Sequence, residues 1–186
     1  MGDSHVNDVA SVVAASALLF VSALAGPAHA DTSNVSPTGF VANFREEVKA
    51  TPEEVWQAIV QLPRWWNDAH TYSGKASNLS LDAVAGGCWC ERWGEGNSVQ
   101  HGHVLLVQPG RVIRMNASLG PLQDLAVNGV LTIVTSAQDG KTTLRMTYRV
   151  AGNVDAGLEK LAPVVDQVIG TQYRRLKSLA ETGKPE

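Results

Sequence analysis

Thr51-Pro52-Glu53-Glu54-Val55-Trp56 is the segment with the strongest local structural signal in this sequence. Thr51 suits the N-cap of a helix, Pro52 suits its first turn, and Glu54 is placed to bond back to the cap. Apolar residues then recur at helical steps until Leu62-Pro63, where we expect the helix to end. A short second helix should follow and carry Trp65-Trp66.

Segments with the residue pattern of strands precede and follow these helices in the sequence. Residues 40–48 alternate loosely in apolar character and predict one strand. From Ser73 to about Val150, strand-length segments separated by turn residues predict an antiparallel meander of about six strands. Within it, Asp139-Gly140 is typical of a tight hairpin turn. The region therefore reads as one antiparallel sheet.

A long helix closes the chain. Its apolar positions recur at helical steps: Leu158, Leu161, Val165, Val168, Leu176 and Leu179. Pro163 should kink this helix or mark its first turn. Gln172 is a lone amide inside the apolar stripe, and a buried amide needs a hydrogen-bond partner. A protein group, a water or a ligand in a cavity could supply that partner.

The predicted elements have the order of the helix-grip fold: a strand, two short helices, a meander and a long last helix. Along the chain these elements carry the following motifs: Thr51 to Trp56, Trp65-Trp66, Gly86-Gly87, His103-Val104 to Pro109-Gly110, and Gly120-Pro121-Leu122-Gln123. Together they resemble the START-like (SRPBCC) superfamily, which includes polyketide cyclases and chaperone-activator homologues. The resemblance implies an α+β domain over residues 39–183, with a curved antiparallel sheet wrapped around the C-terminal helix.

The same resemblance implies an internal cavity for a hydrophobic or aromatic small molecule. It selects no single reaction, because members of the superfamily act as lipid carriers, hormone receptors, cyclases or chaperone regulators. The sequence has no Walker loop, dinucleotide-binding glycine pattern, HExxH motif or nucleophile elbow. With 15 basic and 18 acidic residues it also lacks the basic stripe typical of nucleic-acid binding, so we expect no nucleic-acid partner.

Two cysteines and two histidines form a candidate metal set. Cys88 and Cys90 lie two apart on one predicted strand, and His101 and His103 lie two apart on the next. In a regular hairpin Cys90 would face His101 and Cys88 would face His103, which is a donor set that suits zinc. A bulge would separate the pairs. The alternatives are two free thiols or a Cys88–Cys90 disulfide, although extended residues two apart are about 6.6 Å apart between Cα atoms.

The opposite face of the same strand carries Trp89, Glu91 and Trp93, and we expect it to face the cavity. A carboxylate among tryptophans should be desolvated, and its raised pKa would suit a general acid or base. The alternative is a structural ion pair of Glu91 with Arg92 or Arg114.

These observations give three functional hypotheses. The first is a carrier-like domain for a hydrophobic small molecule, with this set of candidate ligand-binding residues: Trp66, Trp89, Glu91, Trp93, Arg114, Tyr148 and Gln172. The second is a cyclase- or dehydratase-like enzyme in which Glu91 is the acid or base and Arg114 or Tyr148 polarises a carbonyl. The third is a metal- or redox-responsive protein that uses Cys88 and Cys90. Only the third calls for a cofactor, zinc.

The N-terminal region resembles an export signal. An apolar run from Val9 to Gly26 ends in Pro27-Ala28-His29-Ala30, the small-residue pattern that signal peptidase reads. The segment before the run lacks Lys and Arg, which export signals usually have, and the run is also long enough for a membrane anchor. We expect residues 1–30 to be a signal peptide, residues 31–38 a linker, and the mature chain a periplasmic protein without stable membrane insertion. The anchor and a cytoplasmic protein are the alternatives.

Cleavage after Ala30 gives the first prediction. The exported protein should begin at Asp31, because the small-residue site ends at Ala30. The intact mass of protein recovered from the source cell checks this. A mass that retains residues upstream of Asp31 would contradict cleavage there.

Overall fold

The computed structural model describes residues 1–2 and 31–186. The predicted export segment falls on residues 3–30 and so lies outside the described residues. Among the helices of the described part of the chain, none has the length and apolar character needed to cross a membrane.

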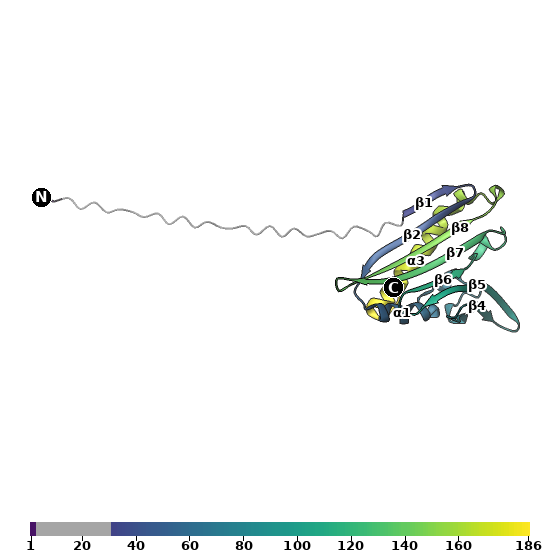
Figure 1. Cartoon of the computed structure of the whole chain (residues 1–186), viewed down its shortest axis with the longest axis horizontal. Helices are drawn as coiled ribbons and strands as arrows, with labels where there is room; N and C mark the ends of the chain where they lie inside the picture. The colour runs from purple at the N-terminus through teal and green to yellow at the C-terminus, as the bar shows by residue number, and fades with distance from the viewer. Residues whose placement is uncertain (3–30) are drawn as a thin grey trace.

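One antiparallel sheet forms the framework of the molecule, in the spatial order β1-β2-β8-β7-β6-β5-β4-β3 (Figure 1). Its strands are β1 (Asp31–Ser36), β2 (Gly39–Val48), β3 (Leu79–Leu81), β4 (Cys88–Trp93), β5 (Asn97–Gln108), β6 (Val112–Asn116), β7 (Asn128–Gln138) and β8 (Lys141–Ala151). The six strands from β3 to β8 confirm the predicted meander. Its last hairpin turns at Asp139 and Gly140, whose φ angles of 52° and 74° fit a type I′ turn.

Two short helices, α1 (Pro52–Val60) and α2 (Leu62–Trp65), connect β2 to the meander. The predicted capping box is present: the Glu54 backbone N–H donates to the Thr51 hydroxyl at 3.2 Å, and the Thr51 backbone N–H donates to the Glu54 carboxylate at 2.7 Å. The short 3-10 helices are η1 (Asp68–His70), η2 (Ala76–Asn78), η3 (Gly120–Leu122) and η4 (Val154–Ala156).

The long helix α3 (Leu158–Thr182) packs against β1, β2 and β8 and against both short helices (Figure 1). Its predicted apolar stripe faces the core, where Leu158, Leu176 and Leu179 are buried. The helix continues through Pro163 and ends at Thr182, where Gly183 follows as the C-cap with the left-handed φ that this position favours. The α+β helix-grip prediction is therefore confirmed.

The segment 31–38 differs from its expectation as a linker. Residues 31–36 form β1, which pairs antiparallel with β2, and Ser36 to Gly39 make the turn between the two strands. β1 lies at the edge of the sheet, and none of residues 32–36 is fully buried, which suits the polar composition of the segment. The sequence predicted a linker here, whereas pairing with β2 satisfies the backbone of residues 31–36.

The capping box yields a stability prediction. Thr51→Ala should lower the free energy of unfolding by about 1 kcal/mol, because the helix loses its side-chain cap. Urea unfolding followed by tryptophan fluorescence measures the change. Thr51→Ser keeps the hydroxyl and is the control, so equal losses in both variants would contradict a capping role.

Candidate functional site

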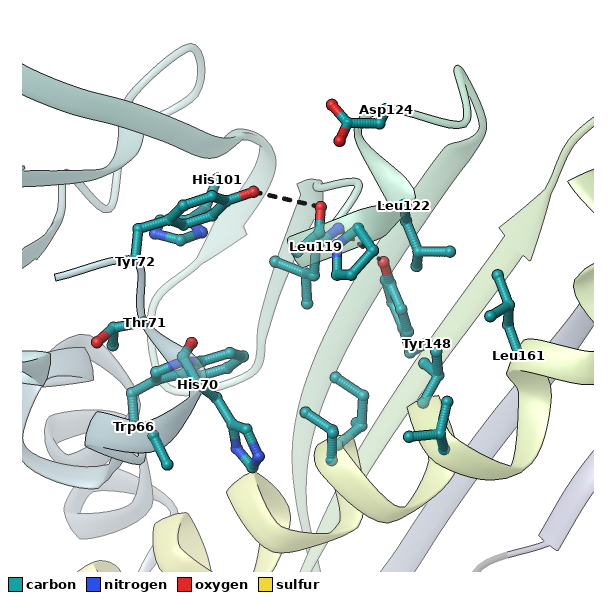
Figure 2. Close-up of a pocket in the computed structure, with 17 residues that line it drawn as sticks. Trp66, His70, Thr71, Tyr72, His101, Leu119, Leu122, Asp124, Tyr148 and Leu161 are labelled. Carbon is teal, nitrogen blue, oxygen red and sulfur yellow. Dashed lines mark hydrogen bonds between the residues drawn. The ribbon is translucent and has the colours of Figure 1, made fainter. Parts of the chain in front are cut away.

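A cavity of about 550 Å³ opens between α3, the chain around η1, and the turn around η3 (Figure 2). Most of its lining is apolar. The lining residues are Trp66, Ala69, His70, Thr71, Tyr72, His101, Leu119, Gly120, Pro121, Leu122, Asp124, Tyr148, Leu161, Val164, Val165, Val168 and Ile169. Its volume lies in the range of small-molecule sites, about 300–1,000 Å³.

Two of the expected ligand-binding residues, Trp66 and Tyr148, line this cavity. The Trp66 indole N–H donates to the His70 carbonyl oxygen at 2.9 Å, which holds the chain at η1. The Tyr148 hydroxyl donates to the Ala117 carbonyl oxygen at 2.8 Å and accepts from the Leu119 backbone N–H at 3.2 Å. Burial raises the pKa of Tyr148, so its hydroxyl stays protonated and holds the turn around η3.

The other expected residues do not line the cavity. Trp89 is fully buried and packs edge-on against Trp66, with ring centroids 4.8 Å apart. Arg114 lies on the exposed face of β6, where its Nε donates to the Thr132 hydroxyl. Trp93 is half-buried at the far end of β4. The geometry thus brings Trp66 and Tyr148 together and leaves Arg114 and Trp93 outside the site.

Gln172 finds its partners within the protein. Its amide contacts the Asn67 backbone N–H, the Val168 carbonyl oxygen and the His70 imidazole. The cavity-lining member of this group is His70. Of the three partners considered for this buried amide, a protein group, a water or a ligand, the structure therefore shows protein groups.

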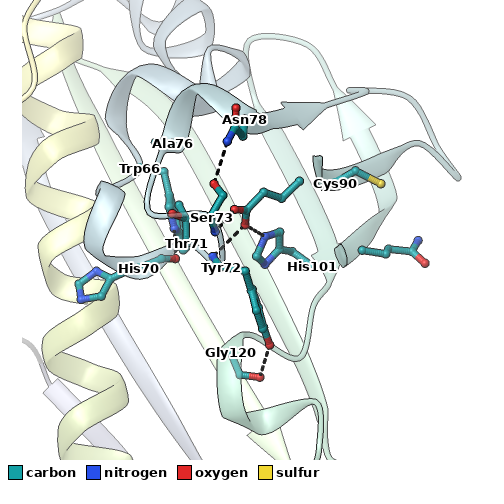
Figure 3. A network of polar contacts seen from close by, with 12 residues as sticks. Trp66, His70, Thr71, Tyr72, Ser73, Ala76, Asn78, Cys90, His101 and Gly120 are labelled. Carbon is teal, nitrogen blue, oxygen red and sulfur yellow. Dashed lines mark hydrogen bonds and ion pairs between the residues drawn. The ribbon is translucent and has the colours of Figure 1, made fainter. Parts of the chain in front are cut away.

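Glu91 is fully buried directly behind the cavity wall and accepts hydrogen bonds from three N–H groups. The donors are the backbone of Ser73 at 2.6 Å, the backbone of Tyr72 at 3.1 Å and His101 Nε2 at 2.8 Å. Figure 3 shows how these groups from the loop and from β5 converge. Because an ionised carboxylate can only accept, His101 must carry its hydrogen on Nε2.

The expectation of a raised pKa for Glu91 is wrong. Burial alone would raise the pKa of Glu91, but the hydrogen bonds from Ser73, His101 and Tyr72 outweigh it and hold the pKa below the ordinary value of a glutamic acid. The anticipated ion pair with Arg92 or Arg114 is replaced by the contact with His101. Glu91 thus holds the cavity wall in place. Because Glu91 itself does not line the cavity, the enzyme hypothesis lacks the acid or base that it assigned to this residue.

A β-bulge explains why sequence reasoning misplaced His101. The register pairs Trp89 with Gly102 but Cys90 with Gln100, so His101 is the extra residue on β5. The predicted pairing of Cys90 with His101 is therefore wrong, while that of Cys88 with His103 is confirmed. The bulge lets the His101 ring reach Glu91 and the cavity.

The metal site is not formed. Cys88 and Cys90 make a disulfide, with Cα atoms 5.4 Å apart, which is closer than two residues of a flat strand. Within residues 1–2 and 31–186, no group of three or more His, Cys, Asp or Glu side chains is arranged to hold a metal ion. Both sulfurs are bonded to each other, so the proposed set with His101 and His103 has no thiolate to offer.

Sequence reasoning did not single out His70, Tyr72 or Asp124 as site residues. Tyr72 is half-exposed, and its hydroxyl donates to the Gly120 carbonyl oxygen at 3.4 Å across the cavity mouth (Figure 2). Asp124 lies exposed at the rim. His70 ends the short η1, and Tyr72 and Asp124 lie in irregular chain, so no apolar periodicity marks them. The one related sequence signal was the lone amide of Gln172 in the apolar stripe of α3, whose partner is His70.

The family model of activator of Hsp90 ATPase homolog 1-like proteins matches residues 49–181, more than half of the chain. The chain belongs to this family. The activator-homologue family is START-like, so the resemblance found in the motifs is confirmed. A comparison with curated protein sequences gave no match.

Solved structures show the same fold as this activator-homologue chain. The Aha1 dimer from Colwellia psychrerythraea has 19% identity and a TM-score of 0.57, and the match covers 77% of this chain and 98% of that one. CalU16 from Micromonospora echinospora has 14% identity and a TM-score of 0.56, with 87% and 88% coverage. A conserved protein of unknown function from Enterococcus faecalis, EF2215, has 12% identity and a TM-score of 0.56, with 84% and 80% coverage. Such distant likenesses establish the fold alone.

The Glu91 contacts give a pH-dependent prediction. Glu91→Gln should lower the free energy of unfolding at neutral pH by about 3 kcal/mol, because the amide cannot accept from all three N–H groups. A carboxyl with a lowered folded-state pKa stabilises the fold above its unfolded-state pKa, and this stabilisation is lost as pH falls through the folded-state pKa. The difference between wild type and variant should therefore shrink below pH 4.5.

Urea unfolding across a pH series measures this difference. Glu95→Gln is the matched control, because Glu95 is exposed in the β4–β5 turn and its change should stay within about 0.5 kcal/mol. A Glu91→Gln difference that is the same at every pH would contradict a role for the ionised carboxylate.

Proposed function

We propose that this chain is an exported, carrier-like protein that binds a hydrophobic or aromatic small molecule in the cavity beside α3. The observation that carries the proposal is the lining of that cavity. Leu161, Val165 and Val168 of α3 face Leu119 and Leu122 across a space large enough for a small molecule. Burial of an apolar ligand against these side chains supplies affinity through the hydrophobic effect.

The polar groups around the cavity support a binding role. Trp66, Tyr148 and Gln172 direct their polar atoms to loop backbone or to His70, so that few polar atoms are left to a ligand. Binding sites of small molecules typically combine an apolar lining with a few placed polar groups. The helix-grip fold of the family suits this role, since it holds a helix against a sheet around such a space.

Two features support export. The small-residue pattern at Ala28 and Ala30 follows an apolar run, as in secreted precursors. The Cys88–Cys90 disulfide fits an oxidising compartment, since structural disulfides are rare in the cytosol. An envelope location makes a lipid-like or aromatic compound the expected cargo.

Filling the cavity should weaken binding. Val165→Trp places an indole in the middle of the α3 stripe and should weaken binding of the neutral dye N-phenylnaphthylamine at least about tenfold, because the ligand loses its space. Dye fluorescence titration measures the affinity. Val154→Trp adds the same indole at an exposed position of η4 outside the cavity and should bind like wild type. Equal affinity in all three proteins would place the dye elsewhere and contradict the proposal.

A further inference from the structure

The amide of Gln172 has one orientation only. Gln172 is fully buried in α3, and its Oε1 accepts from the Asn67 backbone N–H at 2.8 Å. Since a backbone N–H can bond only to the oxygen of the amide, the NH₂ group must point the other way. There Nε2 donates to the Val168 carbonyl oxygen at 3.3 Å and meets His70 Nδ1 at 2.6 Å.

This orientation fixes the hydrogen of His70. An amide NH₂ group can only donate, so His70 Nδ1 must accept and the ring hydrogen must lie on Nε2. Burial lowers the pKa of His70, which favours the same neutral ring. The Trp66 indole holds the His70 backbone, so both ends of the residue are fixed.

The His70 Nε2–H group is left for a ligand. His70 lines the cavity, and none of its hydrogen bonds within the described residues involves Nε2. Among the described residues that line the cavity there is no Lys or Arg. Its charged neighbours are acidic: Asp124 lies at the rim, and Glu91 lies behind His101. A neutral donor beside acidic groups suits an uncharged oxygen acceptor and disfavours a carboxylate.

We propose that His70 recognises an uncharged carbonyl oxygen on an otherwise apolar ligand, and that Gln172 is the positioning residue that keeps the His70 donor in place. This inference rests on the proposed ligand-binding function and names the chemical class of the ligand. Gln172 acts through His70, because the residues that line the cavity include His70 and not Gln172. Ketones, aldehydes, quinones and esters with an aromatic or alicyclic frame belong to this class.

Fluorenone and fluorene test the inference, because they share one tricyclic frame and differ in the carbonyl. Displacement of N-phenylnaphthylamine should show that wild type binds fluorenone about fivefold to tenfold more tightly than fluorene, the effect of one net hydrogen bond. The infrared carbonyl stretch of bound fluorenone should shift to lower frequency. Nitrogen NMR should show the His70 hydrogen on Nε2.

Three variants test whether His70 and Gln172 cause the preference for fluorenone. His70→Phe and Gln172→Met should lose the preference for fluorenone over fluorene and lose the infrared shift. Gln167→Met makes the same change on the exposed side of α3 and should keep both. The nitrogen NMR and infrared measurements on wild type remain decisive if a variant fails to fold.

The outcomes separate this inference from the function on which it rests. Equal binding of fluorenone and fluorene by wild type, a preference that survives in His70→Phe, or a hydrogen on His70 Nδ1 would overturn the inference and leave apolar binding intact. Two results together would overturn the proposed cavity function, and the inference with it. Neither compound would displace the dye from wild type, and Val165→Trp would bind the dye as tightly as wild type does.

Discussion

The cavity depends on a buried carboxylate. Taking the Glu91 charge out of water costs several kcal/mol unless hydrogen bonds replace its hydration, and three N–H groups do so. Two of the three donors are backbone groups of the loop at Tyr72 and Ser73, and the third is His101 on β5. One side chain on β4 therefore fixes both a loop that is far away in sequence and an imidazole of the cavity wall.

Hydrogen bonds between side chains and loop backbone recur around the cavity. The Tyr148 hydroxyl holds the backbone from Ala117 to Leu119, the Trp66 indole holds His70, and Gln172 holds Asn67. Each of these polar atoms satisfies a loop carbonyl or N–H that burial would otherwise leave unpaired. These hydrogen bonds hold the loops in place, while the surface that the loops turn to the cavity is largely apolar.

Periodicity and capping chemistry predicted the fold well. The capping box at Thr51, the Asp139-Gly140 turn and the stripe of α3 are local signals, and each forms as expected. The site was predicted less well because it depends on non-local features. One inserted residue at His101 changes the register of β4 and β5, and no local pattern announces it. The edge strand β1 was missed for a similar reason, since its order comes from pairing with β2.

The cavity takes most of its lining from two loops and one helix, while the sheet contributes mainly His101 and Tyr148. Substitutions at Ala69, Thr71, Pro121 or Val164 would reshape the space without touching a strand pairing. Framework and specificity are thus encoded by largely separate sets of residues. The lining can therefore change while the architecture stays the same.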